Sequence, residues 1–402
     1  MTNLTQTDTS SAVMDTYKRF PLTLTKGKAS FVWDDQGQKY LDYTSGIATL
    51  NLGHIPDQVH AKVTEQLSQL WHCSNLFEIP AQQALAEKLK EVSCFDQAFF
   101  CNSGAEANEA AIKLAKKYAK DQGNSERVEI VSFSGSFHGR TGTTMAATAQ
   151  EKIHQGFSPI TPGFRYLPYN DLTSVPKINN GKTTAVVLEL IQGEGGVRPA
   201  KLDWVKAIAN ECRENDMLLI IDEVQTGMGR TGTLFAYEQY GIEPDIITLA
   251  KGLGSGFPVG SMLAKEHAAK SFQPGTHGST FGGNPLAMTA ALATLETMLD
   301  NNCDLFKNVK NNSTRIFSEL SSWKKDLPNM IDVRGQGYLI GIQFDGEVTG
   351  IITSLREHHV LALVAGPDVL RILPPLTTSK KEIDQFLTIL HDILKAQLEE
   401  GS

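Results

Sequence analysis

The stretch Asp245-Ile-Ile-Thr-Leu-Ala-Lys251-Gly-Leu-Gly-Ser-Gly-Phe-Pro-Val-Gly260 joins a short apolar run to a lysine and a glycine-rich segment. The apolar run is typical of a buried strand. A lysine that ends a strand is usually a solvated cap. At the end of a buried strand, however, desolvation favours the neutral amine, which is the nucleophilic form. The stretch therefore predicts a buried strand that carries Lys251 to the edge of a sheet.

A second apolar run, Met217-Leu-Leu-Ile-Ile-Asp222, ends in a carboxylate 29 positions before Lys251. A lysine and an aspartate at two strand ends are the groups that pyridoxal 5'-phosphate (PLP) requires. The lysine forms a Schiff base with this cofactor, and the aspartate keeps the pyridine nitrogen protonated so that the ring acts as an electron sink. Lys251 and Asp222 are therefore the candidate catalytic residues.

Apolar strands alternate with helical patterns through the middle of the chain. This alternation predicts an α/β fold with a large, mostly parallel sheet covered by helices on both faces. The candidate strands are Gln97–Cys101, Val128–Phe133, Ala185–Ile191, Met217–Asp222 and Asp245–Ala250, and the clearest helices between them are Ala105–Lys120 and Leu202–Asn215.

The length of 402 residues indicates two domains. Residues 1–60 are expected to form an N-terminal segment that joins the smaller domain and contains a hairpin within Phe31–Asp42. Residues 61–295 form the large domain. Residues 296–402 form a smaller α+β domain with strands near Tyr338–Phe344 and Val369–Leu373.

Composition and charge exclude several classes of protein. The net charge of -8 argues against nucleic acid or an anionic membrane as the main partner. The five cysteines form no Cys-x-x-Cys pair, so neither a disulfide framework nor a structural metal site is expected. No apolar run has the length of a membrane span, and the N-terminus lacks the pattern of a secretory signal. These features indicate a cytoplasmic enzyme.

A phosphate site is expected where the strand ending near Cys101 leads into a long helix. Backbone N–H groups at a helix start favour an anion. Ser103 adds a hydroxyl, Gly104 allows close approach of the backbone, and Ala105 opens the helix. Ser103 could instead be only a helix cap. The phosphate interpretation gains weight because this turn is expected at the same sheet edge as Asp222 and Lys251.

The strand Val128–Phe133 leads into a loop with three candidate side chains. Phe137 could stack on the face of a cofactor ring. Arg140 could hold a carboxylate through two parallel hydrogen bonds. His138 is expected to be a loop residue that packs against the ring, without a role in proton transfer.

Six motifs in order resemble the class III (ornithine-type) aminotransferases, which are fold-type I PLP enzymes, and the resemblance covers nearly the whole chain. The motifs are Ser103-Gly-Ala-Glu-Ala-Asn-Glu109, Phe137-His-Gly-Arg-Thr141, Gln192-Gly-Glu-Gly-Gly196, Asp222-Glu-Val-Gln-Thr-Gly227, Ala250-Lys-Gly252 and Ser279-Thr-Phe-Gly-Gly-Asn-Pro285.

The resemblance implies further contacts with the cofactor. Lys251 resembles the Schiff-base lysine and proton shuttle, and Asp222 the partner of the ring nitrogen. Gln225 is similar to the residue that faces the ring hydroxyl, and Val224 to the apolar contact opposite Phe137. The residues similar to the phosphate cup are Ser103, Gly104 and Ala105. Thr280 resembles a residue that reaches the phosphate in the neighbouring subunit, which implies a homodimer with shared active sites.

The resemblance also implies how the site binds carboxylates. Arg140 resembles the arginine that holds the substrate carboxylate, and Arg371 a second arginine that pairs with Glu194. If Glu194 swings away, Arg371 becomes free for the second carboxylate of glutamate or 2-oxoglutarate. A fixed structural salt bridge between Glu194 and Arg371 is the alternative interpretation.

Within this family, four segments are similar to the acetylornithine aminotransferases: Asp15–Pro21, Leu41–Ala48, Gly53-His54 and Pro274–Thr280. Tyr17 and Ile47 of these segments are expected at the substrate site, and Ile47 stands where enzymes acting on free ornithine tend to carry a tyrosine. The implied reaction moves the δ-amino group of N2-acetylornithine to 2-oxoglutarate by a ping-pong mechanism. It gives N-acetylglutamate 5-semialdehyde and glutamate, a step of arginine biosynthesis.

The sequence also leaves other functions to consider. Within the family, the alternatives are aminotransferases of ornithine, succinylornithine or 4-aminobutyrate, and a related semialdehyde aminomutase. The glycines of Gly252-Leu-Gly-Ser-Gly256 suggest a nicotinamide-dependent dehydrogenase, but they lack the Gly-x-Gly-x-x-Gly spacing and the acidic residue that should follow. A non-catalytic PLP-binding regulator would need a DNA-binding module, and no basic helix-turn-helix segment precedes residue 15.

Overall fold

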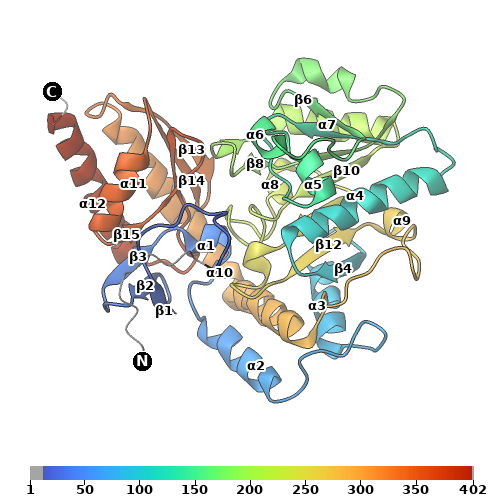
Figure 1. The fold of residues 1–402 in the computed structure, drawn as a ribbon, viewed down its shortest axis with the longest axis horizontal. Helices are drawn as coiled ribbons and strands as arrows, with labels where there is room; N and C mark the ends of the chain where they lie inside the picture. Colours follow the sequence, from blue (N-terminus) through green and yellow to red (C-terminus); the bar gives the residue numbers. More distant parts are fainter. Residues whose placement is uncertain (1–11, 401–402) are drawn as a thin grey trace.

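The computed structural model describes residues 12–400. It has a larger lobe built on a seven-stranded sheet and a smaller lobe that holds two four-stranded sheets. In Figure 1 the large lobe lies on the right, and the small lobe, with both chain termini, lies on the left. Within residues 12–400, no helix is long and apolar enough to cross a membrane.

The large sheet has the strand order β4-β12-β11-β10-β7-β5-β6. Its strands are β4 (Gln97–Cys101), β5 (Glu129–Phe133), β6 (Phe164–Leu167), β7 (Thr183–Leu188), β10 (Leu218–Asp222), β11 (Ile246–Leu249) and β12 (Gly260–Ala264). β12 runs antiparallel to both of its neighbours, whereas the pairings of β11, β10, β7, β5 and β6 are all parallel. The predicted, mostly parallel sheet is confirmed.

Apolar residues cover both faces of this sheet. Alternate residues of β10 face opposite ways, so Ile220 packs with α4 (Gly104–Asp121) in one cluster and Ile221 packs with α7 (Leu202–Glu214) in another. Burying each such side chain contributes about 1.5–3 kcal/mol. Because every residue of β10 is buried, its sequence is a continuous apolar run and not an alternating one.

The small lobe combines the two ends of the chain. The N-terminal strands β1 (Leu24–Lys28), β2 (Phe31–Asp34) and β3 (Lys39–Asp42) pair antiparallel in sequence, and β3 then pairs in parallel with β15 (Val360–Leu361). The hairpin predicted within Phe31–Asp42 is confirmed. The second small sheet contains β13 (Met330–Gln336), β14 (Leu339–Phe344), β17 (Val369–Ile372) and β16 (Leu363–Val364).

A long helix, α10 (Pro285–Trp323), links the lobes: it packs against α2 (Asp57–Leu67) and α3 (Pro80–Glu91) and also against β13. The predicted domain boundaries stay predictions, and the one between 295 and 296 falls inside α10. The remaining elements are α1 (Ser45–Ala48), α5 (Gly142–Ala147), α6 (Glu151–His154), α8 (Tyr237–Tyr240), α9 (Glu266–Ala269), α11 (Thr349–Glu357), α12 (Lys380–Glu400), β8 (Ile191–Gln192), β9 (Arg198–Pro199) and the 3-10 turns Leu172–Lys177 and Lys251–Leu253.

The structure departs from the predicted strands in two ways. The strand predicted over Ala185–Ile191 is broken, because β7 ends at Leu188 and β8 begins a separate two-stranded ribbon with β9. Between them, the carboxylate of Glu189 turns aside to accept a hydrogen bond from the N–H of Phe137 at 2.9 Å. Strands β6 and β12 were not predicted. The sequence of β12, Gly-Ser-Met-Leu-Ala, lacks the β-branched and aromatic residues that mark a strand.

Candidate active site

A cavity of about 460 Å³ opens beyond the carboxyl ends of the parallel strands. Its walls come from the ends of β4, β5, β7, β10 and β11 together with the N-terminal segment at Thr49. Open parallel sheets bind ligands at this edge. Residues that are more than a hundred positions apart in the chain therefore meet in one site.

Lys251 lies in this cavity directly after β11. It opens a short 3-10 turn and has a φ of +37°, an uncommon conformation for a residue with a side chain. Burial lowers the pKa of the Lys251 amine, and the negative charges of Glu194 and Asp222 oppose this shift only in part. Neutral amine is therefore present at a lower pH than for a solvated lysine, as the nucleophilic role requires.

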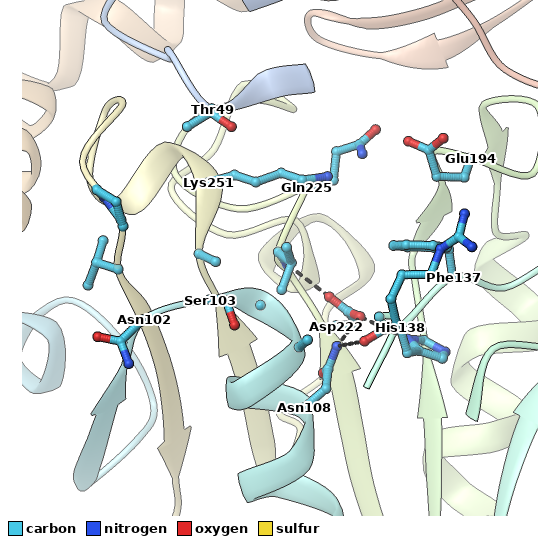
Figure 2. Close-up of a pocket in the computed structure, with 18 of the residues that line it drawn as sticks. Thr49, Asn102, Ser103, Asn108, Phe137, His138, Glu194, Asp222, Gln225 and Lys251 are labelled. Atoms are coloured by element: carbon cyan, nitrogen blue, oxygen red, sulfur yellow. Dashed lines mark hydrogen bonds and ion pairs between the residues drawn. The ribbon is translucent and has the colours of Figure 1, made fainter. Parts of the chain in front are cut away.

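Asp222 lies on the floor of the cavity and is held by several donors (Figure 2). Its Oδ2 accepts from Asn108 Nδ2 at 2.8 Å and contacts His138 Nδ1 at 2.8 Å. Its Oδ1 accepts from the N–H of Val224 at 3.0 Å. Asn108 is itself fixed by the hydroxyl of Thr248, which donates to its side-chain oxygen at 2.8 Å. This network sets the direction in which the Asp222 carboxylate points.

His138 is completely buried beside Asp222. Burial lowers the pKa of His138, but the hydrogen bond and charge of Asp222 outweigh burial, and the net shift is upward. Its backbone N–H donates to the hydroxyl of Thr148 at 2.8 Å, and its Nε2 has no partner among residues 12–400. His138 therefore acts on Asp222, in addition to lining the cavity as a loop residue.

The helix α4 begins at the cavity wall with Gly104. Ser103 caps it, accepting from the N–H of Glu106 at 3.2 Å, so the helix-cap interpretation of Ser103 holds. The same turn also lines the cavity with Ser103, Gly104 and Ala105. A Cβ on Gly104 would stand 2.8 Å from a methyl group of Val224, so only glycine allows this close approach. The free N–H groups of the first turn remain available to an anion.

Two further side chains define the width of the cavity. Phe137 lies on the side opposite Ser103 in Figure 2, and Gln225 lies beside the tip of Lys251. The Oε1 of Gln225 is buried without a hydrogen-bond partner among residues 12–400.

Glu189 is a further buried carboxyl group that lines the cavity. Burial raises the pKa of Glu189 to about 8, although the charge of His138 and the hydrogen bond from the N–H of Phe137 favour the charged form.

Glu194 lines the cavity and forms an ion pair with Arg371, which lies behind it and is not among the lining residues. Arg371 Nη1 donates to Glu194 Oε1 at 2.5 Å. The Arg371 side chain is only 3% exposed, whereas that of Glu194 is 33% exposed. Burial alone would raise the pKa of Glu194, but Arg371 outweighs it and holds this pKa below its usual range.

The structure brings most of the predicted residues together, but not all of them. Arg140 lines the cavity and is solvent-exposed, with its guanidinium 5.8 Å from the ring centre of Phe137. Thr280 lies elsewhere, in a cavity at the outer side of α4, where it is exposed. Tyr17 and Ile47 are 72% and 45% exposed and are not among the lining residues of the active-site cavity.

Ile47 belongs to an unusual segment. Residues Ser45–Ala48 have φ values between 44° and 62°, so α1 is a left-handed turn. Asp42 Oδ1 stabilises it by accepting from the N–H groups of Thr44 and Ser45 at 2.9 Å and 3.2 Å. Left-handed backbone is costly for residues with side chains, above all for a β-branched one. The turn leads into Thr49, which lines the cavity.

Sequence reasoning missed the roles of Asn108, Thr248 and Thr49. Asn108 had a detectable signal: it lies one helical turn after Gly104, on a face of α4 that is otherwise made of buried alanines such as Ala107 and Ala111. A polar residue on such a face needs a buried partner. Thr49 had no comparable signal, because it enters the cavity through the left-handed turn.

These residues fit PLP. The Lys251 amine and the Asp222 carboxylate lie at two ends of the cavity, Phe137 lies on the side opposite Ser103, and Val224 also lines the cavity. The free N–H groups of the first turn of α4 and the unpartnered Gln225 Oε1 are the features expected of a phosphate site and of a contact to a ring hydroxyl.

Known proteins with similar sequences and structures agree on one family. Residues 12–394 match the model of "Aminotransferase class-III". The chain is 61% identical over 387 residues to the acetylornithine aminotransferase of Oceanobacillus iheyensis, covering 96% of each chain. The N-acetylornithine aminotransferase of Stenotrophomonas maltophilia superposes with a TM-score of 0.83 at 36% identity, over 96% of this chain and 98% of that one. An ornithine aminotransferase of Toxoplasma gondii, whose active site is described as partly occupied by PLP, superposes with a TM-score of 0.91 at 29% identity, over 97% and 94%.

Proposed function

This chain belongs to the class III aminotransferase family, and we propose that it transfers the δ-amino group of N2-acetylornithine to 2-oxoglutarate. The products are N-acetylglutamate 5-semialdehyde and glutamate, which makes the reaction a step of arginine biosynthesis. The observation that carries this proposal is the 61% identity to an acetylornithine aminotransferase over nearly the full length of both chains.

Class III aminotransferases depend on PLP. When bound, PLP supplies an electron sink for the carbon that loses a proton. Lys251 binds the cofactor through its amine, which burial keeps available in the neutral form. The same amine would move the proton at the substrate carbon, and the charge of Asp222 would hold a proton on the ring nitrogen of the bound cofactor.

Two arginines explain how one site accepts two kinds of substrate. Arg140 is exposed at the cavity and is free to hold the carboxylate that both substrates share. Arg371 is the candidate for the second carboxylate of 2-oxoglutarate. With acetylornithine, which has one carboxylate, Arg371 keeps Glu194 as its partner. Without Glu194, the buried guanidinium would stand unpaired, which is costly.

The donor is tested with a substrate panel on the purified, PLP-loaded protein. Acetylornithine, succinylornithine, ornithine and 4-aminobutyrate are each supplied with 2-oxoglutarate, and semialdehyde release is followed. We expect acetylornithine to give the highest kcat/KM. Free ornithine is the second candidate, since the Toxoplasma gondii structure superposes well. A preference for ornithine or 4-aminobutyrate would overturn the proposed donor and leave the family unchanged.

We further propose that the enzyme acts in the cytoplasm as a homodimer with shared active sites. Large apolar side chains gather near the Thr280 segment: Leu76, Phe77 and Phe281 are each more than 60% exposed. Asn75 ties the two segments together by donating to the carbonyl of Gly282 at 2.8 Å. Exposed apolar surface of this kind marks a protein interface. A second subunit at this surface would put Thr280 at its partner's phosphate site.

Light scattering combined with PLP titration tests this assembly. We expect a dimer, and we expect Phe281→Asp to yield a monomer that binds PLP weakly. The substitution Phe157→Asp changes a phenylalanine that is exposed to nearly the same extent, 64% against 63% for Phe281, elsewhere in the large lobe, and it serves as control. A monomer with undiminished PLP affinity and activity would reject the shared site.

A further inference from the structure

A second cavity, of about 520 Å³, adjoins the active site, and Glu194 lines both. It lies where the β8–β9 ribbon of the large lobe meets β13 and β14 of the small lobe. Glu194 is thus a residue of both walls. A rotation of this side chain about its own bonds would transfer its charge from one cavity to the other.

The backbone around Glu194 is held in place by the small lobe. Arg334 Nη2 donates to the carbonyl of Gly196 at 2.7 Å, and Arg334 Nε donates to the carbonyls of Gly196 and Val197 at 2.9 Å and 3.2 Å. Val197 is fully buried. These bonds hold the backbone two and three residues after Glu194, so we expect its carboxylate to move mainly by rotation of the side chain.

The two members of the Glu194–Arg371 ion pair differ in how freely they can move. The Glu194 side chain is one-third exposed, and the Arg371 side chain is only 3% exposed. When a substrate carboxylate binds Arg371, we therefore expect Glu194 to move away and Arg371 to stay in place. The displaced carboxylate needs a cation or water, since a charge left without a partner is costly.

Two cations of the second cavity are available for this role. Lys152 and Arg198 both line it, and no ion pair involves either side chain among residues 12–400. Arg198 pairs with Gln192 across the β8–β9 ribbon, so it lies on the same short hairpin as Glu194. The other carboxylate of the lining, Asp368, already accepts from Gln343 Nε2 at 2.7 Å.

We propose that this cavity is the second position of the Glu194 carboxylate. When a substrate with two carboxylates binds Arg371, Glu194 turns into the cavity and pairs with Arg198, while Lys152 adds to the local positive potential. Arg198 is therefore a positioning residue that favours the dicarboxylate half of the reaction. This inference rests on the proposed function, in which Arg371 binds the second carboxylate of 2-oxoglutarate.

The test compares Arg198→Gln with wild type in single-turnover measurements of each half-reaction on the PLP-loaded enzyme. We expect the 2-oxoglutarate half-reaction to slow roughly two- to fivefold at subsaturating substrate, the range for a partly exposed ion pair. The acetylornithine half-reaction should not change. Arg213→Gln is the matched control, because Arg213 is an exposed arginine of the same lobe that lines a different cavity, and it should leave both half-reactions unchanged.

A double-mutant cycle with Glu194→Gln separates this role from a structural one. In the Glu194→Gln background no charge remains to be moved, so Arg198→Gln should have no further effect. An equal loss in both backgrounds, or no loss in the wild-type background, would overturn the second position. The role of Arg371 in the proposed function is tested independently of Arg198. If Arg371→Ala impairs both half-reactions equally, that role is wrong, whatever the effect of Arg198→Gln.

Discussion

Two carboxylates that line the active-site cavity, Asp222 and Glu194, differ in how firmly their partners hold them. The lower pair, Asp222 and His138, has side chains that are 4% and 0% exposed, and Asp222 has two further donors in Asn108 and the N–H of Val224. In the upper pair, the Glu194 side chain is 33% exposed and accepts a hydrogen bond from Arg371 Nη1, while Arg371 Nε has no partner among residues 12–400.

The difference shows how one site can contain both a fixed charge and a movable one. A buried carboxylate with several donors cannot move without leaving those donors unsatisfied, which costs about 1–3 kcal/mol for each. A partly exposed carboxylate with one charged partner can exchange that partner for water or for another cation. We therefore propose that the lower pair serves the cofactor, which stays bound, and that the upper pair serves the substrates, which alternate.

Breaking the lower pair should have the largest effect. Asp222→Asn keeps the size of the side chain and removes its charge. Both half-reactions should slow by on the order of 10²- to 10⁴-fold, the rate equivalent of a broken buried ion pair. Stopped-flow measurement of each half-reaction checks this. PLP should still bind, as followed by its visible absorbance band. A variant that slows only one half-reaction would mean that the lower pair also discriminates substrates.

Removing only the charge of the cation should have a smaller effect. His138→Asn retains a donor near the position of Nδ1, so Asp222 keeps a hydrogen bond to a neutral group. The loss should be about five- to tenfold, the difference between a charged and a neutral donor.

The pH profile sharpens this second test. Because the pKa of His138 is raised, its charge persists below that pKa and is lost as the pH rises through it. The wild-type rate should therefore contain a decline on the alkaline side that His138→Asn lacks. Identical profiles for the two proteins would show that the charge of His138 does not assist Asp222.

The smallest effect is expected at Glu189, the third buried carboxyl near the lower pair. Its pKa is raised from 4.5 to about 8, so the folded state keeps a proton that the unfolded chain has lost. This contribution to the free energy of unfolding is complete below about pH 4.5 and is lost as the pH rises toward about 8. Glu189→Gln should lack this decline.

Thermal unfolding of the cofactor-free protein at several pH values measures this effect. The melting temperature of Glu189→Gln should rise relative to wild type between about pH 5 and pH 8. A constant difference across that range would show that Glu189 titrates normally, in which case its proton does not contribute to the stability of the lower pair.

The sequence alone predicted those parts of the site that follow from short local patterns. Apolar runs that end in Asp222 and Lys251 identify buried parallel strands, and the carboxyl ends of such strands share one sheet edge, so the two residues had to be neighbours. Ser103 and Gly104 followed from the same rule. Glu194 and Arg371 lie far apart in the chain and on different lobes, and no local pattern joins them; the family resemblance suggested that pair.

The rest depended on tertiary structure. Strand β12 was missed because it is stabilised by its neighbours β4 and β11 and not by its own residue preferences. The left-handed turn at Ser45–Ala48 breaks the usual conformational preferences, and contacts with Asp42 compensate it from outside the turn. Asn108 was within reach of sequence reasoning, as the polar residue on an alanine-rich helix face, but its partner Asp222 was not.

We propose that the lower pair serves both half-reactions and the upper pair only one. Single-turnover kinetics of Arg371→Ala with acetylornithine and with 2-oxoglutarate tests it most directly, with Arg140→Ala measured alongside. Loss of a desolvated charge pair costs roughly 2–5 kcal/mol, so Arg371→Ala should slow the 2-oxoglutarate half-reaction by about 30-fold to a few thousand-fold and the acetylornithine half-reaction much less. Arg140→Ala should impair both. Equal losses in the two half-reactions of Arg371→Ala would contradict the claim and reduce Glu194 and Arg371 to a structural salt bridge.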